Sequence, residues 1–313
     1  MTLQHLVSHS VYVQSGKQPS LRKGDGLELL TGYFDVDVSQ WKDAVSVHLP
    51  YVVDWYSVWN GRLALKDEMS DDDVLFFSYG RDRGSIVEAV RKCIEKASPF
   101  RPAYGVIHAG SANIRELFST KYSDSDESVL KAFAEIVNQA VSSFPGNEPP
   151  FRLMFENQWW PGLRMLDGKN YGTLCDLIEF ENWGLCLDTG HLLVTTQESR
   201  DELQAIDLLT DIFGNYPKEM IDAIGTIHLH VNTSAGYIGG YDAPADTANM
   251  PIKEVLNAGY GFVTGMDQHR PFTVKEVRRI TDILRPDYVT HEMGAPDPAQ
   301  RETDYHTQRS LFQ

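Results

Sequence analysis

Short apolar runs alternate with longer amphipathic stretches along most of the chain, and this alternation predicts its fold. The short runs favour strands because polar, Gly or Pro residues bound them. We predict strands at 26–30, 45–49, 104–108, 152–156, 184–188, 226–232, 262–267 and 287–292. Residues at helical spacing between them predict helices at 85–97, 125–144, 171–182, 199–213, 252–259 and 273–285.

The order of these elements favours one architecture. Near-continuous apolar strands that alternate with amphipathic helices are typical of a parallel sheet covered by helices. No glycine-rich phosphate loop follows the first predicted strand, so a (β/α)₈ TIM barrel fits better than a doubly wound sheet. No linker divides the 313 residues. We therefore expect one domain over 1–313, with the barrel at about 26–293 and a long insertion at about 51–83.

Composition narrows the class of partner. A formal net charge of −16 and a pI of about 5.0 give a field that repels polyanions and anionic lipids. No stretch approaches the roughly 18 apolar residues of a membrane span, and no secretory signal begins the chain. Cys93, Cys175 and Cys186 are far apart, which favours reduced thiols over a disulfide or a cysteine metal site. We expect a cytoplasmic protein without a membrane partner.

Histidine, aspartate or glutamate stands at the end of seven consecutive predicted strands. These residues are His48, His108, Glu156, Asp188, His191, His228, His230, Asp267, His269 and Glu292. In a TIM barrel the carboxyl ends of all strands open onto one face, so the side chains should converge. Such groups are costly to bury unpaired, and divalent ions bind N and O ligands of this kind. The pattern predicts one to three divalent metal ions, with Zn²⁺ favoured over Mn²⁺ or Fe²⁺.

Each of these residues taken alone has a simpler explanation. A single histidine at a strand end is commonly a hydrogen-bonded core residue, and Glu156 or Asp188 would be explained as a helix N-cap. His5, His9 and His306 are expected to be ordinary residues of the chain ends, and His291 a packed or outward residue. The repetition at successive strands favours the metal site.

Several motifs together resemble a known family. VHLPY, IHAGS, FEN, LDTGH, HVNTS, DQH and the glutamate of the last strand resemble the xylose-isomerase-like TIM barrels, in particular the AP endonuclease family 2 (endonuclease IV) branch. The resemblance covers about residues 26 to 293. It implies three metal groups: His48 and His108 with Glu156; Glu156 with Asp188, His230 and Glu292; and His191 with Asp267 and His269. The HVNTS segment favours His230 over His228 as the ligand.

Three segments depart from the family pattern. The family's His-x-Ser-x-x-Gly-Gly motif is absent from the first strand, Thr233 replaces an aspartate, and RPFTVKE replaces a glycine-rich stretch. These departures leave the metal set intact but argue against DNA as the substrate.

The number of ions decides between two reactions. A multinuclear site implies metal-hydroxide hydrolysis of a phosphoester, because the ions lower the pKa of a water and hold the attacking and leaving oxygens. Glu156, Asp188 and Glu292 are then expected to act in catalysis. A single ion held by Glu156, Asp188, His230 and Glu292 suits sugar isomerisation, epimerisation or dehydration. A barrel that only binds metal or ligand is the third alternative.

Loop residues bear on the substrate. Tryptophans of two loops are expected to stack on a base or sugar, although loop packing explains them equally well: Trp55, Trp59, Trp159 and Trp160. Arg164, Arg270 and His228 are further expected contacts. The few basic residues and the acidic run 71–73 favour a small sugar or phosphoester over damaged DNA. The oligomeric state is left open.

Overall fold

The chain is a single-domain (β/α)₈ TIM barrel, as the alternation of elements predicts. The computed structural model describes residues 3–11, 18–33, 36–62 and 69–313. Its parallel strands close into a barrel in chain order, with β8 paired to β1. They are β1 (Gln4–Ser10), β2 (Gly26–Leu30), β3 (Ala44–His48), β4 (Tyr104–His108), β5 (Arg152–Glu156), β6 (Trp183–Asp188), β7 (Ile224–Leu229) and β8 (Tyr288–His291).

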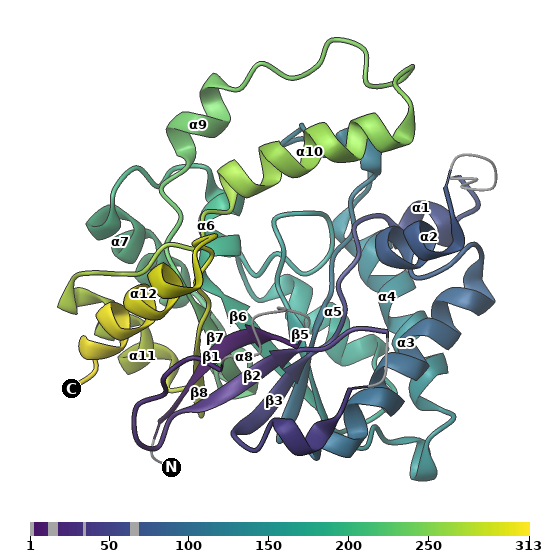
Figure 1. Cartoon of the computed structure of the whole chain (residues 1–313). Coiled ribbons are helices and arrows are strands. Elements are labelled where there is room, and N and C mark those ends of the chain that lie inside the picture. Colours follow the sequence, from purple (N-terminus) through teal and green to yellow (C-terminus); the bar gives the residue numbers. More distant parts are fainter. Residues whose placement is uncertain (1–2, 12–17, 34–35, 63–68) are drawn as a thin grey trace.

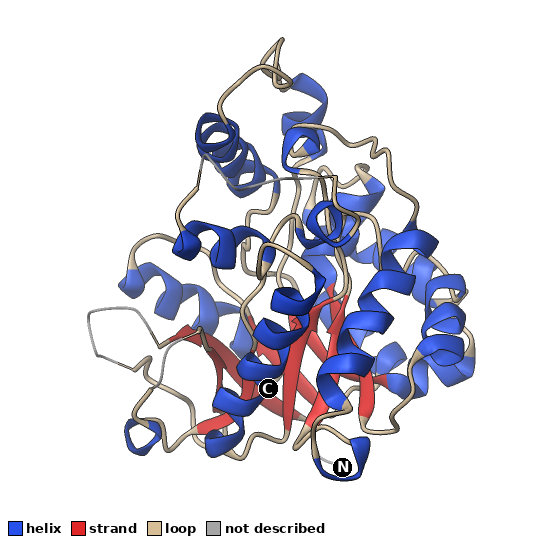
Figure 2. Ribbon diagram, turned by 90° about the vertical axis from the view of Figure 1, so that its right-hand side faces the viewer, coloured by secondary structure: helices blue, strands red, loops and turns tan. Residues whose placement is uncertain are grey.

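Helices surround this barrel (Figures 1 and 2). They are α1 (Trp55–Trp59), α2 (Asp71–Ser78), α3 (Arg83–Ala97), α4 (Asp126–Val141), α5 (Lys169–Leu177), α6 (Thr189–Thr196), α7 (Glu202–Phe213), α8 (Lys218–Ala223), α9 (Ala235–Gly240), α10 (Ile252–Met266), α11 (Arg278–Leu284) and α12 (Pro298–Ser310). Short 3₁₀ turns lie at Val38–Gln40, Ser98–Phe100, Ile114–Glu116, Pro145–Asn147 and Lys275–Val277. Most predicted elements are present, with shifted ends.

The strands bury side chains on both faces, which is why they read as apolar runs. In β5, Leu153 and Phe155 pack in the main core between the barrel and its helices. Met154, between them, points the other way and packs inside the barrel with Leu6, Tyr104, Val106 and Cys186. Because successive strand residues face opposite sides, the last residue of β5, Glu156, also points into the barrel.

The predicted strand at 262–267 is wrong. These residues form the end of α10, which continues to Met266. Gly259 looked like a helix end, but it lies inside the helix where a Cβ would be 2.9 Å from Cδ1 of Leu117. A glycine in the middle of a helix does not end the helix when it is there for close packing. The buried residues Val255, Gly259, Phe262 and Met266 recur at helical spacing across that position.

The missing eighth strand is β1, which lies before the predicted start of the barrel at residue 26. Its sequence, QHLVSHS, is mostly polar and therefore does not form the apolar run that predicts a strand. Leu6 packs inside the barrel, Val7 packs against the helices, and His5 is buried against His291 of β8. His5 is therefore not an ordinary terminal residue.

The connections at the carboxyl ends of the strands carry most of the extra chain. The insertion predicted at 51–83 contains α1 and α2, and its residues 63–68 lie outside the described residues. Helices α9 and α10 lie beyond one end of the barrel in Figure 1. Among the described helices, none combines the length and the apolar character needed to cross a membrane.

Candidate metal centre

Four of the predicted site residues are the final residues of consecutive strands. His48, His108, Glu156 and Asp188 end β3, β4, β5 and β6. The strand register places His108 beside Glu156 and Asp188 beside His228. Parallel strands in register bring these inward-facing side chains to one level of the barrel.

Glu156 lies at the centre of the cluster, with its two carboxylate oxygens facing different histidines. Oε2 is 3.1 Å from Nε2 of His48 and 3.2 Å from Nε2 of His108. Oε1 is 3.2 Å from Nδ1 of His191 and 3.5 Å from Nδ1 of His228. Burial alone would raise the pKa of Glu156, but the surrounding imidazoles hold it well below its usual value.

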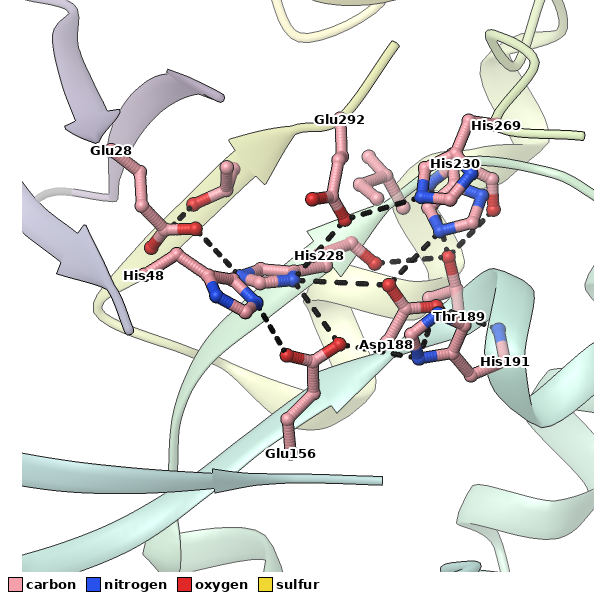
Figure 3. Close-up of polar contacts among 12 residues, drawn as sticks. Glu28, His48, Glu156, Asp188, Thr189, His191, His228, His230, His269 and Glu292 are labelled. Atoms are coloured by element: carbon pink, nitrogen blue, oxygen red, sulfur yellow. Dashed lines mark hydrogen bonds and ion pairs between the residues drawn. The ribbon is translucent and has the colours of Figure 1, made fainter. Parts of the chain in front are cut away.

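His228 lies against the carboxylates that the HVNTS motif grouped with His230. Figure 3 shows its ring between Glu28 on one side and Glu156, Asp188 and Glu292 on the other. Nδ1 of His228 is 3.3 Å from Oε2 of Glu292 and 3.8 Å from Oδ2 of Asp188. The geometry therefore groups His228 with these carboxylates, in contrast to the motif-based expectation. The motif aligned the later of two inward residues at period-2 spacing, and spacing alone cannot separate them.

His230 instead joins the third group. Its ring stacks on that of His269, with centroids 4.0 Å apart. Nε2 of His191 is 3.4 Å from Oδ2 of Asp267, and Nδ1 of His269 is 3.3 Å from the same oxygen. Donor atoms of His191, His230, Asp267 and His269 all lie within 4.8 Å of one another. The structure thus brings together the three residues of the predicted third group and adds His230.

Asp267 and His269 reach the site from a helix end rather than from a strand. Asp267 is the C-cap residue of α10, and the chain then turns back toward the barrel. The Asn232 side chain holds this turn: its Nδ2 donates to Oδ1 of Asp267, and its Oδ1 accepts from the backbone N–H groups of Gln268 and His269. Asn232 was not among the predicted site residues, although HVNTS contains it.

Neighbouring carbonyl groups orient two of the histidines. Nδ1 of His48 is 2.8 Å from the carbonyl oxygen of Leu49, and Nδ1 of His191 is 2.9 Å from that of Asn157. A carbonyl only accepts, so it favours a hydrogen on Nδ1 and leaves Nε2 as the nitrogen available to an ion. These Nε2 atoms face Glu156 and Asp267 respectively, as metal-binding nitrogens should.

Asp188 also acts as a helix N-cap, which was the simpler explanation for this residue. Its Oδ1 accepts the backbone N–H of His191 at 2.6 Å and so caps α6. Its Oδ2 is 2.9 Å from Nε2 of His230. The cap explains one carboxylate oxygen and leaves the other for the cluster.

The buried carboxylates of the cluster are paired with its histidines. Within the described part of the chain, every ion pair of Glu28, Glu156, Asp188, Asp267 and Glu292 is with a histidine. Despite burial, the carboxylates Asp267 and Glu292 raise the pKa of His269 to about 10. Burial wins at His108, whose pKa is lowered. Among the described residues, the charged partners of these carboxylates are therefore histidines, and no lysine or arginine forms an ion pair with them.

These residues fit divalent metal ions. Among the described residues, Glu156 Oε1, His108 Nδ1, His228 Nδ1 and His230 Nδ1 are buried without a hydrogen-bond partner. Four groups of at least three His, Asp or Glu donor atoms lie within 4.8 Å of one another. Buried donors of this kind are costly without partners, and imidazole with carboxylate is the donor set of Zn²⁺, Mn²⁺ and Fe²⁺.

The aromatic residues expected to contact substrate are packed in the core. Trp55, Trp59, Trp159 and Trp160 are all buried, with at most 5% of each exposed. Trp55 donates to the carbonyl of Gly110, and Trp159 packs edge-on against the ring of His191 at 4.9 Å. Their burial is consistent with the loop-packing alternative, and Trp159 in addition contacts His191 of the cluster.

The arginines expected near substrate already have partners. Arg164 donates to the carbonyl of Trp159 and lies 3.8 Å from Asp126. Arg270 donates to the hydroxyl of Thr233.

Besides Asn232, two further residues at the cluster were missed in the sequence. Glu28 is fully buried in β2, and its Oε1 is 2.8 Å from Nε2 of His228. A glutamate inside the apolar run GLELL was the available signal. Tyr51 stacks on His108 with ring centroids 5.0 Å apart, yet 49% of it is exposed. Partial burial, Glu292 and the other acids raise the pKa of Tyr51 to about 12, so it keeps its proton at neutral pH.

Cavity size does not identify this centre. A cavity of about 500 Å³ lies between α2 and α3, lined among others by Tyr33, Ser85 and Cys93. It shares no residue with the cluster. The convergence of donor atoms, rather than the volume of a surface hollow, marks the candidate site.

Comparison with known proteins supports the fold. The chain is similar to a D-tagatose 3-epimerase-like protein, with a TM-score of 0.55 and 14% identity over 99% of this chain and 97% of that one. It is also similar to endonuclease IV from Thermus thermophilus, with a TM-score of 0.49 and 14% identity over 98% of each chain. For 3-keto-D-glucoside 4-epimerase from E. coli the TM-score is 0.48, with 10% identity over 99% of this chain and 100% of that one.

At these identities the first of these likenesses shows a shared fold, the TIM barrel that the xylose-isomerase-like resemblance implied. Neither a protein-family model nor a curated protein sequence matches the chain.

Proposed function

We propose that the protein is a metal-dependent hydrolase that cleaves a phosphoester at a multinuclear centre. One observation carries the proposal: the two oxygens of Glu156 face separate sets of histidines, Oε2 toward His48 and His108, and Oε1 toward His191 and His228. A carboxylate placed in this way is suited to bridge two ions. The group of His191, His230, Asp267 and His269 offers donors for a third.

Bound divalent ions would supply Lewis acidity and a water of lowered pKa. His48, His108 and Glu156 would hold one ion; Glu156, Asp188, His228 and Glu292 a second; and His191, Asp267 and His269, with His230 beside them, a third. The donors on β3 to β8 are fixed by barrel register, so they need little rearrangement to bind.

Residues around the donors would orient the substrate and exclude water. Trp159 covers one edge of His191, so solvent is kept from that side of the cluster. Tyr51 covers His108 and remains half exposed, so its ring and protonated hydroxyl are available to a substrate at the opening. A phenol of raised pKa donates a hydrogen bond and does not act as a base at neutral pH.

The chemistry of the chain favours a small phosphoester over DNA. The formal net charge is −16, and three arginines of the loops have partners within the protein: Arg164 lies 3.8 Å from Asp126, Arg62 pairs with Asp124, and Arg270 donates to the hydroxyl of Thr233. The acidic run 71–73 forms the first turn of α2, where negative charge stabilises the helix. A protein that contacts several DNA phosphates usually offers a basic surface for them.

Sugar epimerisation or isomerisation at a single ion is the second candidate. The observation in its favour is that Glu156, Asp188 and Glu292 surround Nδ1 of His228, which suffices for one ion with carboxylates beside it to move a proton. The fold likeness to a D-tagatose 3-epimerase-like protein supports the same alternative.

The number of bound metal ions, followed by assays of substrate turnover, distinguishes phosphoester hydrolysis from sugar epimerisation or isomerisation. Elemental analysis of untagged protein should find near three Zn²⁺, Mn²⁺ or Fe²⁺ ions per chain. The loaded protein should then hydrolyse small phosphomonoesters or phosphodiesters faster than abasic DNA. A single ion per chain with epimerisation of ketoses and no phosphate release would establish the second candidate. No ion and no turnover on either panel would refute both.

A further inference from the structure

Glu28 is a charged residue with no role in the three proposed groups of metal ligands. It lies in the middle of β2 and is fully buried. Its Oε2 accepts from the hydroxyl of Ser46 at 2.9 Å and lies 3.3 Å from the hydroxyl of Thr290. A buried carboxylate is retained at considerable cost unless it is paired, so its partner identifies its purpose.

The charged partner of Glu28 is the far nitrogen of His228. Oε1 of Glu28 lies 2.8 Å from Nε2 of His228, and both side chains are fully buried. In the present ring orientation the N–H is not well aligned with the oxygen, and neither atom has another hydrogen-bond partner among the described residues. Figure 3 shows Glu28 on the opposite side of the ring from Glu156, Asp188 and Glu292.

This arrangement determines which nitrogen of His228 can bind an ion. A metal-binding imidazole is neutral and carries one hydrogen, and Glu28, the nearest carboxylate to the ring at 2.8 Å, favours that hydrogen on Nε2. Nδ1 then keeps its lone pair and points at Glu156 and Glu292, 3.5 Å and 3.3 Å away. Histidines that bind metals commonly pair their other nitrogen with a carboxylate, which raises their basicity as ligands.

We propose that Glu28 is a positioning residue that holds His228 with Nδ1 toward the metal centre and thereby selects His228 over His230 as the ligand shared with Glu156, Asp188 and Glu292. This inference rests on the proposed function, because it requires that the centre binds a divalent ion. The carboxylate beside Nε2 of His230 is Asp188, itself one of the proposed metal ligands, and Nδ1 of His230 has no hydrogen-bond partner among the described residues.

The wild-type protein provides the first test. Long-range ¹H–¹⁵N correlation spectra of histidine-labelled protein loaded with Zn²⁺ report which nitrogen of each ring carries the hydrogen, and the spectrum of His228→Gln assigns the His228 signals. We expect His228 to be protonated at Nε2 and metal-bound through Nδ1. Protonation at Nδ1, or metal signals from His230 in its place, would overturn the proposal whether or not any Glu28 variant folds.

Glu28→Gln provides the second test, because the amide keeps the size of the side chain and removes its charge. Zn²⁺ titration by calorimetry with a competing chelator should show one ion bound about 10- to 100-fold more weakly, with the other ions unchanged. Thr226→Val is the matched control: Thr226 is also fully buried in the barrel, but it bonds Tyr104 instead. It should bind Zn²⁺ as the wild type does.

The outcomes separate the two proposals. Wild-type protein that binds no ion refutes the proposed function and this inference with it. Wild-type protein that binds Zn²⁺, together with a Glu28→Gln variant of unchanged affinity and unchanged His228 tautomer, refutes the role of Glu28 alone. An equal loss of affinity in Thr226→Val would also refute it, because the effect would then reflect general loosening of the barrel.

Discussion

The imidazole rings of His230 and His269 stack face to face, with centroids 4.0 Å apart and planes 7° from parallel. One residue follows β7 and the other follows α10, so two separate connections of the barrel bring them together. Two stacked imidazoles beside Asp267 and His191 form a donor group that shares no residue with the group of His48, His108 and Glu156. This separation makes the third group testable by itself.

Replacing Asp267 should remove one ion and leave the rest. Asp267→Ala deletes a carboxylate whose Oδ2 faces both His191 and His269, so elemental analysis should fall from near three ions per chain to near two. Asp282→Ala, on the outer helix α11, is the control and should bind as the wild type does. An unchanged metal content in Asp267→Ala would contradict a third ion at this group.

Replacing Glu156 should affect two groups together. Glu156→Gln removes the charge that faces His48 and His108 on one side and His228 on the other. Metal content should fall toward one ion, and kcat/KM for a phosphoester should fall more than about 100-fold, since even indirect partners of ligands contribute 10- to 100-fold. Glu148→Gln, in the loop before β5, is the control. Loss of a single ion would mean that Glu156 does not bridge.

Gly190 is required where α6 passes His230. A Cβ at this position would lie 1.9 Å from Cε1 of His230, so Gly190→Ala must displace the ring. We expect a loss of about 1–3 kcal/mol in the free energy of unfolding, typical of overpacking, and weaker binding of the third ion. Gly172→Ala in α5 meets nothing within 4 Å and should stabilise by about 0.4–1 kcal/mol. Denaturant unfolding of the two variants measures the contrast.

The buried pair of His5 and His291 should make stability depend on acid pH. Burial lowers the pKa of His5 from 6.5 to about 4. Between these values the unfolded chain binds a proton that the folded protein excludes, so the free energy of unfolding rises with pH and is lost as pH falls from 6.5 toward 4. The shift corresponds to about 3 kcal/mol.

His5→Asn keeps a polar group near Nδ1 and removes this titration. Chemical denaturation of both proteins at several pH values between 4 and 7 should show a steeper decline for the wild type. Parallel curves would indicate that His5 titrates in the folded state as it does in the unfolded chain.

Local pattern was enough to predict the barrel and most of the cluster. The strands β2 to β8 appear in the sequence as nearly continuous apolar runs because both of their faces are buried. Polar residues such as His108 and Glu156 stand at the ends of these runs, where the strands of a TIM barrel open onto its functional face. The convergence of these residues follows from parallel strand order, which needs no knowledge of side-chain contacts.

Tertiary packing decided the remainder, for physical reasons that the sequence does not display. The stretch 262–267 looks like a strand when Gly259 is taken as a helix end, but Gly259 lies inside α10 and packs against Leu117. β1 is a strand because it pairs with β2 and β8, and its buried His5 contacts His291. His228 and His230 share one strand face in sequence. In the folded barrel, Glu28 of β2 lies beside Nε2 of His228, and Nδ1 of the same ring faces Glu292.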